Sequence, residues 1–533
     1  MVENEQDVAL EDTDRIHGRE ALVNNVKAAS SLADAIRSTL GPKGLDKMLV
    51  EADGSALVTN DGVTVLETAQ VEHPTARLLI DASSSQDRAA RDGTTTTVLL
   101  VSEMLHNALE LVRMGVHPSV VVNGYGIALE EALEEVERVA READEDQRLQ
   151  VVRTTLEGKA DSRLCDLFAG LAIQAADALS EEDGGGDLER LRVKRLQVRQ
   201  GNVMDSSLVQ GLMLPKSRVD ISTPASSGGG VVAIVDGGLE HPKLEISAKI
   251  EVNSPGVIQG FHDRAIENLQ RQVDHLASLG VDLLIVRDGI ADEGISLLVK
   301  AGITAYRRFE RTDLELLSKM TGANLSRDAL HIDEGDLGSY AGRSEESIAE
   351  VKHTLIEGTR GGAMTLVVRG SSPAVREEAT RVFDDAIGVA HRLTSKPGIL
   401  PGGGAIQTHL GRHLRSFAPS QAGREQLAIE AYAAALEIVP RTLADNGGFD
   451  PVDVILALSA DQSESGAWIG FDLGKGKNGD MGEAGILDPL FVVRHALSGA
   501  TEAAISVLRI DDVLWAKTEI GTPDWKDEEG SED

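Results

Sequence analysis

Residues 92–105 read DGTTTTVLLVSEML, an acid and a glycine followed by four threonines and then by an apolar run. Asp is a good helix N-cap, so the segment predicts a helix that begins here and buries its apolar side chains. Successive threonines are poor in a helix interior, but at a helix start they lie beside backbone N–H groups that lack helical partners. Those N–H groups and the helix dipole attract phosphate. The alternative is a plain capped helix whose threonines face solvent.

Two glycine-rich loops could also approach an anion. The segment Thr39–Gly44, TLGPKG, has two glycines around a Pro-Lys pair, which lets the backbone come close to an anion while Lys43 supplies charge. The alternative for this segment is a helix C-cap followed by a turn. The second loop, Gly402–Gly404, follows Pro401 and precedes a predicted helix.

Carboxylates would complete a phosphate site. Phosphoryl transfer to water needs Mg²⁺ held by a carboxylate and a group that orients the water. Asp61, in an Asn-Asp-Gly turn, Asp92 and Asp385 are candidates. Spacing alone does not choose among the 87 acidic residues.

A third glycine motif does not indicate a dinucleotide-binding fold. Residues 474–479, GKGKNG, match the GxGxxG pattern after a strand-like run. No long helix follows, and a dinucleotide fold requires one, so we interpret the segment as a hairpin loop. The sequence also contains no GxxxxGK[ST] motif, which disfavours a P-loop ATPase.

The periodicity of apolar residues predicts a helical first part and a helical last part around an α/β middle. Short β-like runs are expected at Ala56–Thr59 and Val63–Leu66, on either side of the Asn-Asp-Gly turn. Short apolar strands alternate with helices between residues 231 and 370, which indicates an α/β domain. Helices are expected at 19–40, 92–140 with a break at 115–118, 372–396, 420–446 and 494–507.

Length and composition narrow the class of protein. A chain of 533 residues is expected to form two to four domains. Aromatic residues make up only 3% of the chain, so its cores must consist of Ala, Val, Leu and Ile. The formal charge of -35 argues against a nucleic-acid partner. Abundant Asp and Glu with 16 Lys against 36 Arg resembles the proteins of salt-loving archaea, where salt screens self-repulsion; an ordinary acidic protein is the alternative.

Other features predict a cytoplasmic protein. Cys165 is the only cysteine, which excludes an intramolecular disulfide or a CxxC site, and we expect it to be buried. The N-terminus is acidic and lacks an apolar core, unlike a signal peptide. No apolar run approaches the ~18 residues of a membrane span.

Taken together, the motifs resemble the group II chaperonins of the archaeal thermosome type, in order and spacing, over residues 14 to 518. The segments that carry the resemblance are RSTLGPKGLDKMLV (37–50), VTNDGVTVLETAQVEHPTARLL (58–79), QDRAARDGTTTTVLL (86–100), LPGGGA (400–405) and SGATEAAISVLRIDDVL (498–514).

The resemblance implies a multidomain α and α/β chaperonin fold. A helical equatorial ATP-binding domain would combine residues 1–143 and 398–520, and a small α/β intermediate hinge domain would combine 144–207 and 361–397. Residues 208–360 would form an α/β apical domain that binds substrate and carries a helical protrusion at 244–269. An acidic, disordered tail would follow at 521–533.

The resemblance also implies a site for ATP and Mg²⁺, with K⁺ possible. Asp61 and Asp385 would orient and activate the water, Asp92 would hold Mg²⁺, and Lys159 would sense the γ-phosphate. Gly403 would touch the nucleoside, with Glu483 near the ribose and Asn478 near the adenine. The phosphates would be bound by Thr39, Leu40, Gly41, Pro42, Lys43, Gly93, Thr94, Thr95 and Thr96.

The implied function is ATP-driven folding of non-native polypeptides inside two eight-membered rings stacked back to back. The rings would contain one subunit type or several. The chain departs from the family at Arg91, where the family has a glycine that could need a positive φ, at 395–398, and in its acidic tail. These departures leave a slow or ATPase-deficient paralogue acting as a holdase in a mixed ring as an alternative. A small-molecule kinase is a further alternative if only the phosphate loops are real.

Overall fold

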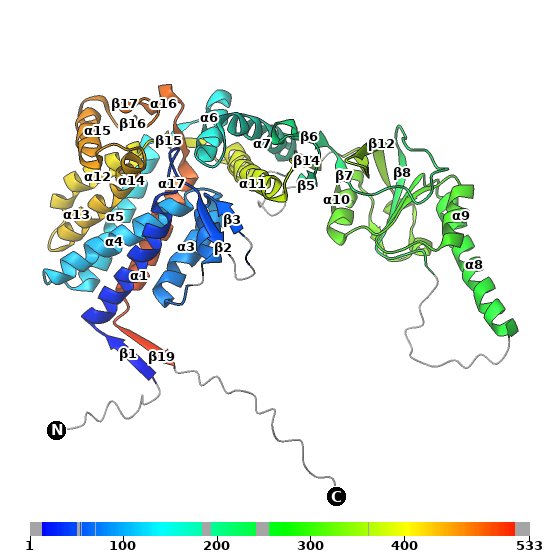
Figure 1. Cartoon of the computed structure of the whole chain (residues 1–533), viewed down its shortest axis with the longest axis horizontal. Coiled ribbons are helices and arrows are strands. Elements are labelled where there is room, and N and C mark those ends of the chain that lie inside the picture. Colours follow the sequence, from blue (N-terminus) through cyan, green and yellow to red (C-terminus); the bar gives the residue numbers. More distant parts are fainter. Residues whose placement is uncertain are drawn as a thin grey trace, which may run out of the picture. The chain divides into compact units, whose positions relative to one another are not determined.

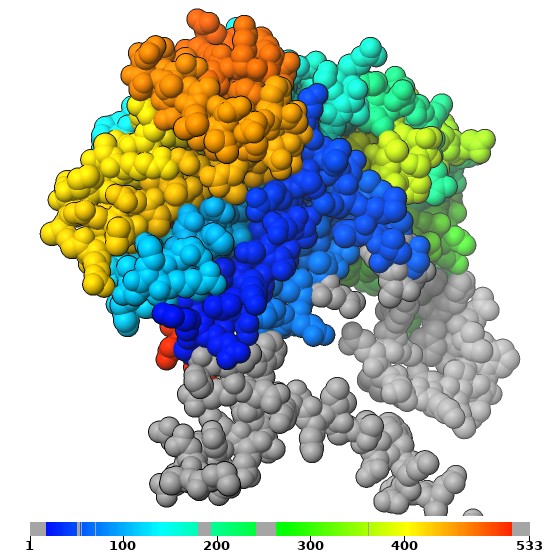
Figure 2. Space-filling model, turned by 60° about the vertical axis from the view of Figure 1, so that its left-hand side comes forward, coloured from blue at the N-terminus to red at the C-terminus, as the bar shows by residue number. Residues whose placement is uncertain are grey.

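The computed structural model describes residues 13–50, 54, 56–69, 71–183, 193–240, 255–360 and 362–516. The chain divides into two compact units (Figure 1). Unit 1 comprises residues 1–154 and 398–533, and unit 2 comprises residues 155–397. Figure 2 shows the first part of the chain, in blue and cyan, lying directly against the last part, in yellow and orange. Unit 1 is therefore built from segments that are far apart in the sequence.

Unit 1 is a helical body around a large apolar core, with a smaller apolar cluster formed by Ala444, Val454, Phe471 and Leu473. Helix α4 is its central element, since it packs against α1, α3, α13 and α17. Small residues let the helices approach closely: a Cβ added to Gly124 of α5 would lie 2.4 Å from Cβ of Ala428 in α13. The helices are α1 (Arg19–Arg37), α2 (Gly62–Thr68), α3 (Pro74–Ala90), α4 (Thr94–Arg113), α5 (Pro118–Val139), α12 (Ala405–Phe417), α13 (Glu425–Leu436), α14 (Ile438–Asn446), α15 (Pro451–Ser465), α16 (Met481–Ala484) and α17 (Leu490–Leu508).

Short antiparallel pairings connect the ends of these helices. Strand β15 lies between β18 and β4, and this small sheet leads directly into the glycine loop at 402–404. Strands β16 and β17 form a hairpin around residues 473–476, which confirms the prediction of a hairpin loop there. The bounds are β1 (Thr13–His17) with β19 (Asp512–Ala516), β2 (Lys47–Val50) with β3 (Ala56–Thr59), β4 (Arg141–Glu142), β15 (Gly398–Pro401), β18 (Leu487–Pro489), β16 (Ile469–Asp472) and β17 (Lys477–Asp480).

Helix α6 (Glu145–Leu156) reaches into unit 2, which begins at Thr155, and the described part of unit 2 contains two sheets. The larger has the order β10-β9-β8-β12-β13-β7, with β11 paired to β8. Alternate residues of β8 pack toward α8 and α9 on one face and toward α10 on the other. The bounds are β7 (Leu212–Leu214), β8 (Gly230–Val235), β9 (Leu283–Val286), β10 (Thr304–Tyr306), β11 (Leu325–Ser326), β12 (Gly338–Ile348), β13 (Val351–Gly358), α8 (Pro255–Ser278), α9 (Asp292–Lys300) and α10 (Arg311–Thr321).

The smaller sheet places β14 (Met364–Arg369) between β5 (Val193–Val198) and β6 (Ser207–Gln210), parallel to β5. Helices α7 (Ser162–Asp183) and α11 (Pro373–Ser395) pack on each other beside it, with the rings of Phe168 and Phe383 edge to face at 6.4 Å. The sequence 363–370 thus forms a strand as predicted, but in a second sheet rather than in the main one.

Most of the predicted elements are confirmed, and the buried position of Cys165 is confirmed too. The run Val63–Leu66 is an exception, because it lies in helix α2 and not in a strand. Asp61 explains the difference: its carboxylate accepts hydrogen bonds from the backbone N and the hydroxyl of Thr64, at 3.1 and 2.6 Å, and so caps the helix. The Asn-Asp-Gly sequence is therefore a helix start rather than a hairpin turn.

The predicted three-domain division stays a prediction. Within the predicted protrusion at 244–269, residues 244–254 lie outside the described residues, and α8 begins at Pro255. The acidic tail at 521–533 also lies outside them. No helix in the described part of the chain combines the length and apolar character that a bilayer span requires.

The close contact between α5 and α13 can be tested with two glycines of one helix. Gly124→Ala would place a methyl group against Ala428, and we expect the free energy of unfolding to fall by about 1–3 kcal/mol. Gly126→Ala is the matched control, because a Cβ there meets nothing within 4 Å. It should raise stability by about 0.5–1 kcal/mol through helix propensity. Equal stability of the two variants in chemical denaturation would contradict this packing.

Candidate functional site

The loop after α1 lies against the start of α4. The hydroxyls of Thr39 and Thr95 are 3.5 Å apart, and Thr39 is 3% exposed. Asn446 of α14 donates to the carbonyls of Arg37 and Leu40, at 3.1 and 2.9 Å, and so fixes the end of α1. The predicted loop at 39–44 and the predicted helix start therefore belong to one place in unit 1.

The glycines of the 39–44 loop are required by close contacts. Gly41 has φ +84°, and a Cβ there would lie 2.3 Å from Cδ2 of Leu443. A Cβ on Gly44 would lie 2.2 Å from the carbonyl oxygen of Thr39. Pro42 and Lys43, between the two glycines, are exposed. Leu40, before the first glycine, is half-buried. The loop thus presents its lysine outward on a fixed backbone.

Asp61 also lies beside the start of α4. A Cβ on its neighbour Gly62 would approach the hydroxyl of Thr95 to 2.5 Å. The carboxylate of Asp61 is oriented by its two bonds to Thr64, as described for the start of α2. The fold thus places this predicted catalytic residue next to the predicted phosphate-binding threonines.

The bend that leads into α4 is made by two left-handed residues. Arg91 has φ 56° and ψ 16°, and Gly93 has φ 77° and ψ 14°. The expectation that Asp92 caps the helix is wrong, since Gly93 is the residue in the cap position and makes no side-chain cap. The expectation that position 91 could need a positive φ is confirmed. Because the first helical bond runs from Thr97 N to Gly93 O, the N–H groups of Thr94–Thr96 have no partner within the helix.

The glycine loop between β15 and α12 lies against the β16–β17 hairpin. Gly403 and Gly404 have φ of +60° and +71°, and a Cβ on Gly403 would come within 2.7 Å of the carbonyl oxygen of Phe471. Gln462 holds the start of α12 through a bond to the carbonyl of Ala405, at 2.9 Å. Only glycine fits this close approach.

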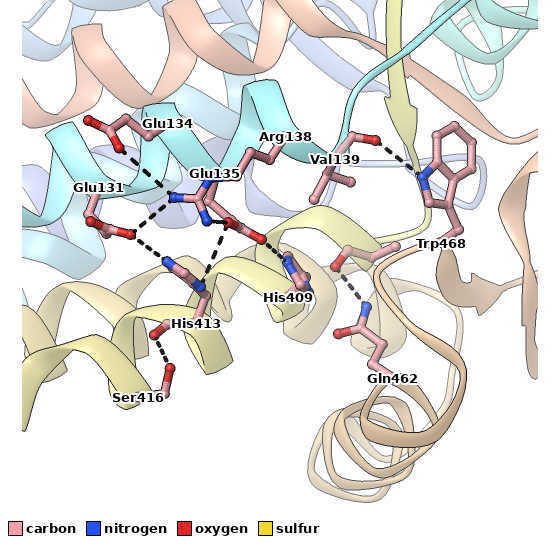
Figure 3. Close-up of polar contacts among 11 residues, drawn as sticks. Glu131, Glu134, Glu135, Arg138, Val139, His409, His413, Ser416, Gln462 and Trp468 are labelled. Atoms are coloured by element: carbon pink, nitrogen blue, oxygen red, sulfur yellow. Dashed lines mark hydrogen bonds and ion pairs between the residues drawn. The ribbon is translucent and has the colours of Figure 1, made fainter.

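Histidine–glutamate contacts fix α12 to α5 (Figure 3). His409 and His413 lie one turn apart on α12 and contact Glu135 and Glu131 of α5, at 2.7 and 2.6 Å. Arg138 contacts the second oxygen of Glu135, at 2.6 Å. The glycine loop therefore begins a helix that is held at several points.

The hairpin and the short helix after it carry two of the three residues predicted to lie at the nucleoside. Asn478 lies on β17, and its amide donates to Asp461 of α15 at 2.7 Å. Glu483 is exposed in the short helix α16, which follows directly. The backbone N of Phe471 donates to Gly403 O at 3.1 Å, so the hairpin is attached to the glycine loop although the side chain of Asn478 is engaged elsewhere.

Asp488 is a site residue that sequence reasoning missed. It lies on β18 opposite Leu400 of β15, and a Cβ on Gly402 would be 3.3 Å from its Oδ1. Burial, and then the charge of Asp92, raise the pKa of Asp488 to about 7. The charges of Asp92 and Asp488 therefore interact, and Asp488 also lies beside the glycine loop. The Asp-Pro sequence at 488–489 is the only local signal for this residue. It does not indicate a site by itself, because Asp488 reaches the glycine loop only through the pairing of β18 with β15.

Asp92 and Asp488 suit a magnesium ion. In the described ranges, no group of three or more His, Cys, Asp or Glu side chains could by itself hold a metal ion. Mg²⁺ is commonly held by one or two carboxylates together with substrate phosphates, so a carboxylate pair beside a phosphate-binding helix start fits it.

The remaining two predicted residues lie together in unit 2. Lys159 Nζ is 2.8 Å from Oδ2 of Asp385, and their side chains are 20% and 19% exposed. The neighbouring Asp384 instead contacts Arg195, at 2.6 Å. The predicted site residues therefore form two groups, one in each unit.

The strain at Arg91 predicts that a smaller residue is more stable there. A left-handed non-glycine residue costs about 1–2 kcal/mol, whereas the partly exposed pair between Arg91 and Asp87 contributes under about 0.5 kcal/mol. Arg91→Gly should therefore raise the free energy of unfolding by about 0.5–1 kcal/mol in chemical denaturation. Arg88→Gly, in the last turn of the same helix, should lower it by about 1 kcal/mol; a loss of stability in both variants would rule out the strain.

The raised pKa of the buried Asp488 predicts a pH dependence of stability. The folded protein keeps a proton on Asp488 up to about pH 7, whereas the unfolded chain releases it near pH 4. Stability from this group therefore falls as the pH rises from about 4 to about 7. Without nucleotide or Mg²⁺, Asp488→Asn should be more stable than the wild type by roughly 1–3 kcal/mol at pH 8 and nearly equal to it at pH 4.5.

Thermal unfolding at the two pH values measures this difference. The exposed variant Glu464→Gln removes the same charge and should change stability little at either pH. A gain for Asp488→Asn that is equal at both pH values would argue against the raised pKa of Asp488.

Comparison with known proteins identifies the family of this chain. The model of the TCP-1/cpn60 chaperonin family matches residues 32–518. The thermosome subunit alpha of Thermoplasma acidophilum is 38% identical over 514 residues, which cover 96% of this chain and 94% of that protein. A thermosome subunit of Methanopyrus kandleri is 37% identical over 510 residues, covering 94% and 93%. Thermosome subunit 1 of Haloferax volcanii is 38% identical over 510 residues, covering 95% and 90%. The resemblance to group II chaperonins and the multidomain α and α/β fold class are therefore confirmed, and the chain belongs to the TCP-1/cpn60 chaperonin family.

Proposed function

We propose that this chain is an ATP-hydrolysing subunit of a double-ring chamber that encloses and folds non-native polypeptides. The observation that carries the proposal is the meeting, in unit 1, of the 39–44 loop, the free start of α4, the glycine loop and the Asp92–Asp488 pair. Each of these suits a different part of a nucleotide, and the family supplies the expectation that the nucleotide is ATP.

The phosphates would lie at the start of α4. There the N–H groups of Thr94–Thr96 and the helix dipole favour negative charge, and Lys43 lies exposed on the neighbouring loop. Asp92, beside Asp488, would hold Mg²⁺, which supplies charge neutralisation at the phosphates. Gly403 would allow the nucleoside to approach the backbone, with Glu483 near the ribose and Asn478 near the adenine; Asn478 would then have to leave Asp461.

Asp385 would act on the attacking water together with Asp61. A carboxylate that accepts the water's proton raises its nucleophilicity, and the effect is typically worth about 10²–10⁴-fold in rate. Lys159 would sense the γ-phosphate, so its contact with Asp385 would be exchanged for the nucleotide during the cycle. Lys159 and Asp385 belong to unit 2, in the two segments of the proposed hinge domain at 144–207 and 361–397.

The proposed cellular setting and assembly follow from the family and from the net charge of the chain. The chain would work in the cytoplasm, in eight-membered rings of one or several subunit types, and its apical residues 208–360 would bind clients. A formal charge of -35 suits a salt-rich cell, because at high ionic strength the repulsion between surface carboxylates is screened. The similarity to a Haloferax volcanii subunit supports this setting.

The strained Arg91 favours a second candidate, a slow or inactive ATPase that acts as a holdase in a mixed ring. Arg91 lies next to Asp92 in a left-handed conformation that suits glycine. A displaced bend would weaken Mg²⁺ binding while leaving client binding unchanged.

Substitutions of two neighbouring carboxylates distinguish the ATPase from the holdase. In multimolar KCl with Mg²⁺, Asp385→Ala should lower the ATPase kcat by about 10²–10³-fold and leave nucleotide binding intact, because a proton acceptor is lost. Asp384→Ala removes the neighbouring carboxylate, which contacts Arg195, and should keep most of the activity. No turnover by the wild-type assembly would exclude the ATPase and favour the holdase.

A further inference from the structure

A buried amide lies behind the Asp92 bend and has no role in the proposed function so far. Gln86, in the last turns of α3, is fully buried at 0% exposed. Its Nε2 donates to the carbonyl of Asp92 at 2.8 Å and to the carbonyl of Val492 in α17 at 3.3 Å. Its Oε1 lies 2.6 Å from Nδ1 of His495. One side chain thus connects α3, the bend and α17.

The chemistry of these partners allows only one orientation of the amide. Two carbonyl oxygens can only accept, so the NH₂ group of Gln86 must face them and its oxygen must face His495. Since that oxygen also only accepts, Nδ1 of His495 must carry a proton. His495 therefore prevents the amide from turning, and every donor in the network has an acceptor.

The bend needs this support because its backbone is strained. Arg91 is held in a left-handed conformation by its backbone bond to the carbonyl of Asp87, at 2.8 Å. The next contact along the chain is the bond from Gln86 to the carbonyl of Asp92. Gly93 packs on the same amide, since a Cβ there would lie 3.0 Å from both Nε2 of Gln86 and Cγ1 of Val492.

We propose that Gln86, oriented by His495, is a positioning residue that fixes the peptide of Asp92 and thereby its carboxylate for Mg²⁺. This inference rests on the proposed Mg²⁺–nucleotide site. Without the amide, the Asp92 carbonyl would lose its hydrogen bond from Gln86, and the bend would relax from the left-handed conformation at Arg91. Asp92 would then meet the metal only in a fraction of molecules, so the apparent affinity for the metal would fall by that fraction.

Gln86→Glu is the sharpest test, because it keeps the shape and replaces the donor by acceptors that face two carbonyl oxygens. In the full-length assembly, the Mg²⁺ concentration for half-maximal ATPase activity should rise about tenfold. In the nucleotide-free protein, hydrogen exchange of the amides in residues 91–95 should become faster. An unchanged Mg²⁺ dependence, or unchanged exchange in this peptide, would overturn the proposal.

Gln462→Glu is the matched control. Gln462 is also buried, at 3% exposed, and its Nε2 also donates to two carbonyls, those of Ala405 and Ile469, at 2.9 and 2.8 Å. It supports the glycine loop and not the bend, so its variant should lose stability and nucleotide affinity without a shift in Mg²⁺ dependence. An equal Mg²⁺ shift in both variants would mean that general destabilisation is the cause.

Variants of His495 keep the test valid if Gln86→Glu does not fold. His495→Gln retains a donor for the amide oxygen and should stay within about twofold of the wild type in Mg²⁺ dependence, whereas His495→Leu should raise the half-maximal Mg²⁺ concentration about threefold. Equal behaviour of the two would overturn the role of His495. If the wild type hydrolyses no ATP, the proposed function fails, and exchange in residues 91–95 still decides whether Gln86 fixes the bend.

Discussion

The burial of helix α4 is the constraint on which the rest of unit 1 depends. Val98, Leu99, Leu100 and Val101 are consecutive and each is at most 1% exposed, so the helix is surrounded on all sides and not on one face. Burying such side chains contributes about 1.5–3 kcal/mol each. A helix held this firmly places its first N–H groups at a fixed point, and the loops from α1, α2 and β15 meet there.

The site keeps several unfavourable features that this core can tolerate. A left-handed arginine, two carboxylates whose charges interact and glycines with no room for a side chain gather around the start of α4. Strained backbone and like charges persist only where the surrounding structure determines them. Bound phosphates and Mg²⁺ would relieve the repulsion between Asp92 and Asp488 and complete the helix start. A charged ligand of the proposed kind would therefore offset the unfavourable features of this arrangement.

The sequence indicated the parts of the site that depend on local chemistry. Glycines in the 39–44 and 402–404 loops and the threonines after Gly93 could be identified because tight backbone approach and helix starts have local signatures. The helix at Val63–Leu66 was missed because its alternating apolar residues suit a strand equally well, and the cap by Asp61 decides between them. Asp488 was missed because it acquires its position only when β18 pairs with β15. Family resemblance, and not spacing, suggested Lys159 and Asp385, which are 226 residues apart and in contact.

The central claim is that the two groups of residues, one in each unit, act on the same nucleotide. A structure of the assembled rings with Mg²⁺, ADP and a γ-phosphate transition-state analogue tests it most directly. The account predicts the phosphates at Thr94–Thr96, the metal at Asp92, and the carboxylate of Asp385 within hydrogen-bonding distance of the attacking water. A nucleotide bound elsewhere, or a fully occupied site whose attacking water Asp385 does not contact, would contradict it.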